Sequence, residues 1–214
     1  MILLFLLPLV FLTGVSAVCP DKFLLFKRTP TAKNNFTKEY CLGFVPFFDM
    51  NIREDARSVC AFMESSLALP ENQQELDALI RLKGENKSVA VDGEFSTRCK
   101  AKFYREDFGS GTNTVFEKGE CNPKNDLFVF DDRNTDTTFF KNNFGHTGLV
   151  RSGYNGIEIG GTEVKLYRNP SCVMMGPDGR YEIEHCDLNP HDNKPDTIRT
   201  YVGALCGVHP RYPK

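Results

Sequence analysis

The pattern of apolar and polar positions divides the chain into an apolar start, a hairpin, two helices and a long region of short strands. Residues 23–26 and 40–45 are apolar runs that predict two paired strands. The polar segment between them, residues 27–39, predicts an exposed loop.

Two amphipathic helices are expected next. Residues 51–63 repeat apolar side chains at helical spacing, with Asn51 as N-cap and Glu54 as its capping-box partner. A second helix is expected to open at Pro70, where a missing N–H costs nothing, and to end near Gly84. The expected buried positions are Ile52, Ala56, Val59, Cys60 and Met63 in the first helix, and Leu76, Leu79, Ile80 and Leu82 in the second.

The rest of the chain alternates short apolar runs with Gly-, Asn- and Asp-rich segments. The strand candidates are residues 88–91, 127–130, 157–159, 163–167, 172–175 and 203–208. A hairpin, two helices and then a β-rich half predict an α+β fold with short antiparallel sheets. Residues 92–161 are expected to form a long loop region.

The first residues have the form of a signal peptide. Residues 1–12 are apolar, and Val15-Ser16-Ala17 places small residues at −3 and −1 of a cut after Ala17. The run is shorter than the roughly 20 residues that a membrane helix needs. We therefore expect a signal peptide at 1–17, one domain at 18–214, secretion to the extracellular space and no membrane span. A buried N-terminal strand or helix is the alternative.

Cysteine use agrees with export. After residue 17 there are eight cysteines, Cys19, Cys41, Cys60, Cys99, Cys121, Cys172, Cys186 and Cys206. An even number in a secreted chain predicts four disulfides, although eight cysteines allow 105 pairings. Asn35-Phe36-Thr37 and Asn86-Lys87-Ser88 are glycosylation sequons, so Asn35 and Asn86 are expected to carry glycans.

Composition excludes one class of partner. The chain is 41% hydrophobic with 18 Phe, enough for a real core, and its net charge is −2. Basic and acidic residues are interspersed, which argues against a nucleic-acid surface.

Motifs for catalysis are missing from the sequence. There is no Gly-x-Ser-x-Gly elbow, P-loop or dinucleotide fingerprint. A paired set of cysteines leaves no thiol for a Cys–His pair. The one close trio for zinc is His185, Asp187 and His191, and surface histidines are the favoured interpretation. We expect no catalytic residue, metal or cofactor.

Two clusters allow two interpretations each. Asp131, Asp132, Asn134 and Asp136 form a turn or an ion site, and the turn is favoured because the order departs from an EF-hand. The side chains of Phe139, Phe140 and Phe144 are either satellite core, which is favoured, or an exposed aromatic patch for a ligand.

Several fragments resemble the C-type-lectin-like domain family, and in particular its nematode members. They are residues 19–23 and 41–44 for its opening hairpin, 56–60, 67–68 and 71–76 for its two helices, and 172–175, Gly179, Cys186 and 205–207 for its closing strands. The resemblance implies the pairs Cys19–Cys41, Cys60–Cys206 and Cys172–Cys186, with Cys99–Cys121 as an extra staple.

The chain departs from the family at its calcium and sugar site. Sugar-binding members use a Glu-Pro-Asn or Gln-Pro-Asp triplet, then Trp-Asn-Asp before the penultimate cysteine. Here Ile183 stands where that Asp would be, residues 167–171 contain no acidic triplet, and the chain has no Trp. Residues 89–92 take the place of the family's Trp-Ile-Gly-Leu motif. An aliphatic side chain cannot bind Ca²⁺, so we expect this site to be degenerate.

The resemblance implies a secreted, non-enzymatic recognition protein. Its expected ligand is a glycan or an extracellular protein, bound without the usual calcium site, and its expected setting is innate defence. A protein-binding or inhibitor module is the first alternative. A secreted hydrolase with an unrecognised site is the second.

Overall fold

The computed structural model describes residues 16–47, 53–84, 87–98, 127–144, 154–159, 162–167, 170–186 and 201–213. The described elements are β1 (Phe23–Lys27), η1 (Ala32–Asn34), β2 (Glu39–Pro46), α1 (Arg53–Phe62), β3 (Ser66–Leu67), α2 (Gln73–Lys83), β4 (Ser88–Phe95), β5 (Phe128–Val129), α4 (Thr138–Asn143), β6 (Tyr154–Ile159), β7 (Thr162–Tyr167), β8 (Pro170–Met175), β9 (Tyr181–His185) and β10 (Tyr201–Val208). This is the predicted order of a hairpin, two helices and a β-rich half, so the α+β fold is confirmed.

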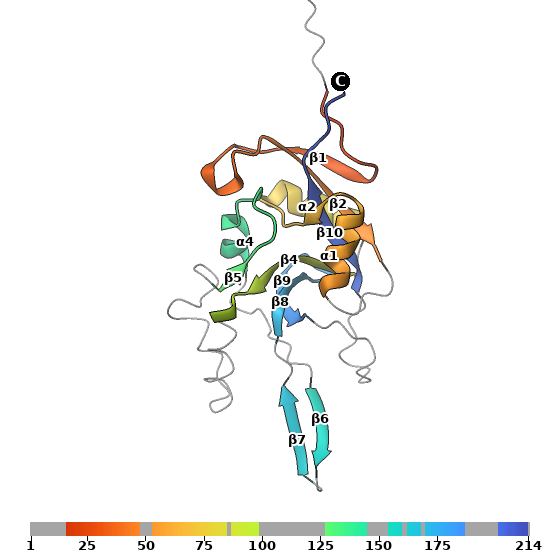
Figure 1. Ribbon diagram of the computed structural model, residues 1–214, viewed down its shortest axis with the longest axis vertical. Helices are drawn as coiled ribbons and strands as arrows, with labels where there is room; N and C mark the ends of the chain where they lie inside the picture. The colour runs from red at the N-terminus through yellow and green to blue at the C-terminus, as the bar shows by residue number, and fades with distance from the viewer. Residues whose placement is uncertain are drawn as a thin grey trace, which may run out of the picture.

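The main sheet has the order β1–β2–β10–β4–β8–β9, with β3 paired to β10 and β5 paired to β4 (Figure 1). Neighbours along this order are antiparallel except β10 and β4, which are parallel. The last strand therefore lies between the opening hairpin and the middle of the chain. Val18 also pairs with Arg211, so the first and last described segments meet.

Alternating side chains divide the core between the two faces of the sheet. On one face, Cys41, Ala90 and Cys206 pack with Ala56 and Cys60 of α1. On the other face, the residues next to them in the strands pack with α2 and with the aromatic side chains around α4. That second set contains Tyr40, Leu42, Val89, Val91, Leu205, Leu76, Leu79 and Phe140. The sheet is thus the middle layer between α1 and α2.

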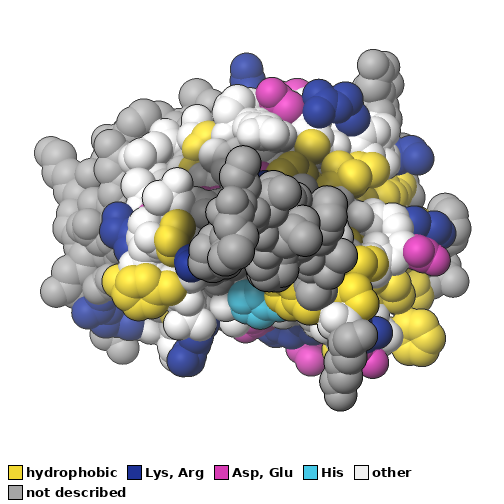
Figure 2. Space-filling model, turned by 90° about the horizontal axis from the view of Figure 1, so that it is seen from above, with side chains coloured by type: hydrophobic (Ala, Val, Ile, Leu, Met, Phe, Trp, Pro, Cys, Tyr) yellow, Lys and Arg dark blue, Asp and Glu magenta, His cyan; other side chains and the backbone are white. Residues whose placement is uncertain are grey.

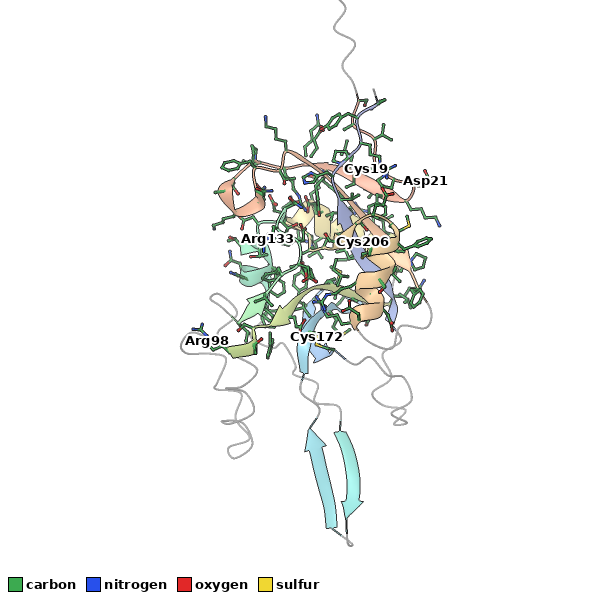
Figure 3. The ribbon with its side chains drawn as sticks, viewed as in Figure 1. Cys19, Asp21, Arg98, Arg133, Cys172 and Cys206 are labelled. Carbon is green, nitrogen blue, oxygen red and sulfur yellow. A yellow bond between two sulfur atoms is a disulfide. The ribbon has the colours of Figure 1, made fainter. Side chains whose placement is uncertain are left out.

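Three disulfides join the described residues, and Figure 3 labels one cysteine of each. They are Cys19–Cys41, Cys60–Cys206 and Cys172–Cys186, the same pairs that the resemblance implies. The first closes the opening hairpin, the second ties α1 to β10, and the third ties the start of β8 to the end of β9. Cys99 and Cys121 lie outside the described residues.

Both predicted helices are present with shifted boundaries. Pro70 does not open α2, because the side chain of Asn72 is the N-cap and accepts the N–H of Glu75 at 3.0 Å. Gly84 ends this helix with φ +78°, as expected. The expected N-cap of α1, Asn51, lies outside the described residues.

The buried sides of the helices differ in part from the expected ones. Leu76 and Leu79 are buried, whereas Leu82 is 38% exposed. Glu75 and Lys83 are buried instead, each held by polar partners. Burial of these charged residues follows from pairing, which helical periodicity does not register.

The 3-10 helix η1 and the α-helix α4 were not predicted. The short α4 covers a segment that we assigned to a polar loop, because its six residues are too few for a periodic signal. No helix among the described residues is long and apolar enough to cross a membrane.

Candidate functional site

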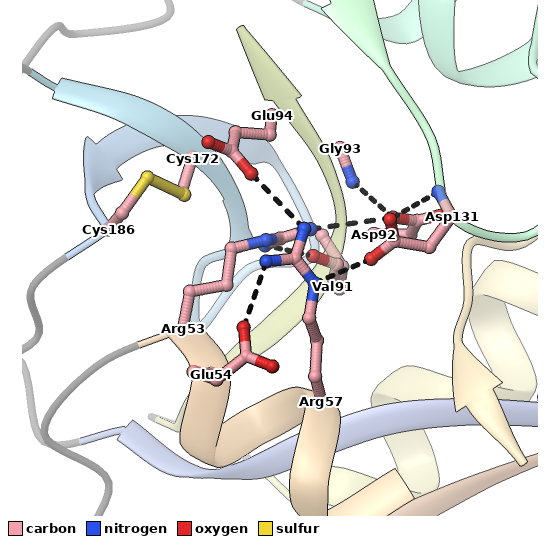
Figure 4. The surroundings of a disulfide bond; sticks show 10 residues. All are labelled: Arg53, Glu54, Arg57, Val91, Asp92, Gly93, Glu94, Asp131, Cys172 and Cys186. Atoms are coloured by element: carbon pink, nitrogen blue, oxygen red, sulfur yellow. Dashed lines mark hydrogen bonds and ion pairs between the residues drawn. A yellow bond between two sulfur atoms is a disulfide. The ribbon is translucent and has the colours of Figure 1, made fainter. Parts of the chain in front are cut away.

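The candidate site is the end of the sheet at which β4 ends, β8 begins and β9 ends, here called the loop-bearing end. The strand register places Glu94, Cys172 and Glu184 in one row across these strands. Near this row the described fold continues into segment 99–126, which joins residues 98 and 127, and into segments 168–169 and 187–200, which join residues 170 and 186. The other end of segment 187–200 joins Tyr201, which pairs with Ser88 at the start of β4. Its floor is built from paired charges and the Cys172–Cys186 disulfide (Figure 4).

Arg53 anchors the start of α1 to this floor. Its backbone N–H donates to the carbonyl oxygen of Cys186 at 2.7 Å. Its guanidinium donates from Nη1 to the carbonyl of Val91 at 2.8 Å, and Nη2 lies 3.4 Å from Oδ1 of Asp92. The side chain is 5% exposed, and burial lowers the pKa of Arg53, partly offset by Asp92. One buried residue therefore holds a helix, a strand and a disulfide together.

Asp92, the partner of Arg53, binds backbone N–H groups of β4 and of the turn at residues 131–132. Its carboxylate accepts the N–H groups of Gly93 at 2.8 Å, Asp131 at 3.1 Å and Asp132 at 2.9 Å (Figure 4 draws the first two). Burial raises the pKa of Asp92 to about 6, against the opposing effect of the N–H groups of Asp132 and Asp131 and of Arg53. Asp92 thus fixes residues 131 and 132 to β4.

Arg57 lies one turn further along α1 and forms ion pairs with three carboxylates. Its guanidinium is 2.7 Å from Asp131, 3.1 Å from Glu94 and 3.2 Å from Glu54. The three partners come from a turn, a strand and the helix itself. The guanidinium therefore occupies the place where these acidic groups converge (Figure 4).

Residues 131–136 are a structural turn in which the side chains bond to the protein itself. Asp132 accepts the N–H of Asn134 and the hydroxyl of Thr135, each at 2.7 Å. The buried guanidinium of Arg28 donates to the carbonyl of Asn134 and to the hydroxyl of Thr135 at 2.9 and 3.0 Å. These contacts support the turn interpretation over an ion site.

One group of potential metal ligands is found among the described residues. It consists of Glu94, Cys172 and Cys186, whose ligand atoms lie within 4.8 Å of one another. Both sulfurs form a disulfide, and the thiolate is the form that binds metals. Glu94 also pairs with Arg57. The donor set as it stands does not suit a cation.

The aromatic residues of α4 belong to the core. Phe140 is fully buried, and its ring centroid lies 4.9–5.6 Å from those of Tyr181, Phe128, Phe144 and Phe130. Phe139 and Phe144 pack against the same cluster. The satellite-core interpretation is correct, and these residues are not an exposed patch.

The remaining predicted site residues are distributed as follows. Asn35 is exposed in the connection from β1 to β2. Asn86, Asp187, His191 and residues 1–15 lie outside the described residues, as do the side chains of Ile183 and His185.

Sequence reasoning missed Arg28, Arg53, Arg57 and Asp92. One signal for Asp92 was available, because this acidic residue directly follows a strongly apolar run in a predicted strand.

Sequence comparison identifies relatives across most of the chain. The family model of C-type lectin domain-containing protein 141/158 matches residues 25–209. In Caenorhabditis elegans, C-type lectin domain-containing protein 141 is 26% identical, covering 90% of this chain and 66% of the relative. C-type lectin domain-containing protein 158 of the same organism is 28% identical, covering 56% of this chain and 57% of the relative. The chain thus spans less than two-thirds of the length of either relative.

Among solved structures, the cow C-type carbohydrate-recognition domain of CD23 is similar to this chain. The match has 13% identity and a TM-score of 0.43, and it covers 91% of this chain and 98% of the other. The family assignment rests on the sequence match.

Proposed function

Because the chain belongs to the family of C-type lectin domain-containing protein 141/158, we propose that it is a secreted protein that binds a carbohydrate or another extracellular ligand without the usual calcium site. The family's domain is a non-enzymatic recognition domain. Because this chain covers only 66% and 57% of the two relatives, the proposal concerns this domain.

The observation that carries calcium independence is the position of Arg57. Its guanidinium lies between Glu54, Glu94 and Asp131, the carboxylates that converge at the loop-bearing end. A calcium ion there would have to displace a built-in cation and find six to eight oxygens. Asp92, close by, is already bonded to three N–H groups. The missing acidic triplets in the sequence support the same conclusion.

The segments joined at the loop-bearing end are the proposed ligand-binding surface. Segment 99–126 is joined at both ends to residues near the end of β4, and segments 168–169 and 187–200 are each joined at one end to the strands tied by the Cys172–Cys186 disulfide. Arg53 and Arg57 fix the same floor. Binding residues are commonly found on loops that a rigid scaffold positions. The paired charges of the floor support a scaffolding role beneath such a surface.

The test is ligand binding with and without a chelator. We expect the purified chain to bind the same glycans on an array in calcium and in EDTA. Binding that disappears in EDTA would contradict calcium independence. If the chain binds no glycan on the array but captures one extracellular protein, the protein-binding or inhibitor alternative is favoured. Turnover of an arrayed glycan or peptide would favour the hydrolase.

A role in innate defence is part of the same proposal, and it is supported by the relationship to the nematode family. We expect the chain to bind intact bacteria or fungi in EDTA and not to bind cells of the animal that produces it. Equal binding to both kinds of cell would contradict a defence role and leave ligand recognition standing.

A further inference from the structure

The exposed sequon Asn35-Phe36-Thr37 lies in a well-anchored turn. Asn35 is the C-cap of η1 with φ +52°. The turn is held because the N–H of Phe36 donates to the carbonyl of Thr31 at 2.8 Å, and that of Thr37 to the carbonyl of Asn34 at 3.0 Å. The side chain of Asn34 also donates to Glu71 of the segment before α2 at 3.0 Å. Asn35 is therefore displayed outward on a fixed support.

Thr37 carries a buried hydroxyl that the described part of the fold leaves without a hydrogen-bond partner. Thr37 is 3% exposed, and its Oγ1 makes no hydrogen bond to any residue that the structure describes. A buried hydroxyl without a partner destabilises the folded state, and valine would fill the same volume without that cost. A hydroxyl two residues after Asn is, however, required for N-glycosylation. The sequon therefore accounts for the Thr37 hydroxyl, which the described fold does not use.

Phe36 is unusual in both backbone and exposure. Its φ is +56°, a conformation that is rare for bulky side chains. Its side chain is 68% exposed. Phe36 directly follows the glycosylation position, Asn35. The strained backbone holds this ring in solvent, where it offers an apolar face to a neighbouring group. The group that the sequence places next to it is the sugar on Asn35.

We propose that Asn35 carries an N-linked glycan and that its first N-acetylglucosamine packs against the ring of Phe36. In this reaction, Nδ2 of Asn35 forms a bond to C1 of a lipid-linked oligosaccharide diphosphate. The C1–O bond breaks with its electron pair leaving on the diphosphate, and Nδ2 loses one proton. The sugar then covers apolar ring surface in the folded domain and stabilises it.

The glycan position is compatible with ligand binding. The connection from β1 to β2 lies at the upper end of the molecule, while β8 and β9 lie below (Figure 1). Seen from above, hydrophobic and basic side chains are interspersed over this end (Figure 2). A glycan there leaves the loop-bearing end open. The inference rests on the proposed secretion, since the donor belongs to the secretory pathway.

The experiment compares sugar removal in two backgrounds. The full chain with Asn86→Gln is expressed in a eukaryotic host, with and without the additional change Phe36→Ser. Each protein from the medium is trimmed to one sugar by an endoglycosidase or stripped by an amidase. We expect a glycan on the Asn35 peptide by mass spectrometry. In the protein that keeps Phe36, complete removal of the glycan should lower Tm by about 2–4 °C, whereas trimming to one sugar should leave Tm unchanged. In the Phe36→Ser protein, complete removal should not change Tm. Phe62→Ser, at a residue 88% exposed on α1, is the matched control and should leave the effect unchanged.

Other outcomes separate the claims. Secreted protein without sugar on Asn35 would overturn this inference and leave secretion standing. Equal loss of Tm in both backgrounds would overturn the contact with Phe36. A chain that stays in the cytosol would contradict the proposed secretion. In that case the chain is exported with an established signal peptide added to its N-terminus, and mass spectrometry of the Asn35 peptide tests whether the glycan is attached. Thr37→Val, made in a bacterial periplasm without N-glycosylation, should raise Tm, and a lower Tm would show that the fold uses this hydroxyl.

Discussion

Arg28 and Glu75 form a two-point ion pair inside the domain, with Nε and Nη2 of the guanidinium each donating to one carboxylate oxygen at 2.8 Å. Both side chains are essentially fully buried. The same guanidinium lies 4.4 Å from the ring centroid of Tyr40 and holds the turn at Asn134 and Thr135. Arg28 therefore connects the end of β1 to α2 and to the turn.

Breaking this pair from one side should be costly. Glu75→Gln leaves the buried guanidinium with only the more distant carboxylate of Glu71, at 3.6 Å, and we expect a loss of about 3–5 kcal/mol in the free energy of unfolding. Urea unfolding followed by circular dichroism measures it. Asp178→Asn, which breaks the exposed pair with Arg180, is the control and should cost less than about 1 kcal/mol. Arg28→Met combined with Glu75→Leu should recover most of the loss. Equal costs for Glu75→Gln and Asp178→Asn would contradict a structural role for the pair.

The disulfides should differ in their contribution to stability according to the length of chain that they close. Cys60–Cys206 spans 146 residues and Cys172–Cys186 spans 14. A chain-entropy estimate gives about 5 kcal/mol for the first and about 3 kcal/mol for the second. Replacing each pair by alanines and measuring unfolding in urea tests this difference. A larger loss from the shorter loop would show that local strain or residual structure, and not chain entropy, decides their contributions.

Sequence patterns predicted the elements whose signals are local and periodic. The opening hairpin and both long helices repeat apolar residues over many positions, and the apolar part of β4 is a single run. The helix α4 is too short for such a signal, and its identity depends on packing of Phe140 against distant strands.

The paired charges could not be predicted for a different reason. Arg28 and Glu75 are 47 residues apart, and Arg53 and Asp92 are 39 apart. Taken singly, each belongs to a residue type that is almost never fully buried without a partner. Folding brings the partner alongside, and no local pattern reports that contact. The floor of the candidate site is therefore a product of tertiary structure.

Gly203 should be intolerant of any side chain. It lies in β10 where the register shifts between Tyr201 and Ala204, and its φ is +155°. A Cβ atom there would overlap the carbonyl oxygen of Val45, so the backbone of β2 would have to move. We expect Gly203→Ala to lower the free energy of unfolding by more than about 2 kcal/mol. Gly84→Ala is the control, because it has φ +78° but its nearest contacts are at 3.9 Å. If both variants lose the same stability, backbone strain alone accounts for the effect.

Asp92 should make stability depend on pH with a defined sign. Burial raises its pKa from 3.8 to about 6 in the folded state, with Arg53, Arg57, Glu94 and Asp131 around it. The folded state therefore binds a proton more readily than the unfolded chain, so protonation of Asp92 stabilises the fold as pH falls from 6 towards 4. Asp92→Asn cannot titrate and lacks this contribution. The free energy of unfolding of the unmodified chain minus that of the variant should rise by on the order of 2–3 kcal/mol between pH 7 and pH 4. Urea unfolding across that range measures the difference. A constant difference would mean that Asp92 keeps its ordinary pKa. A falling one would mean that Arg53 and the three N–H donors outweigh burial and hold the carboxylate in its charged form.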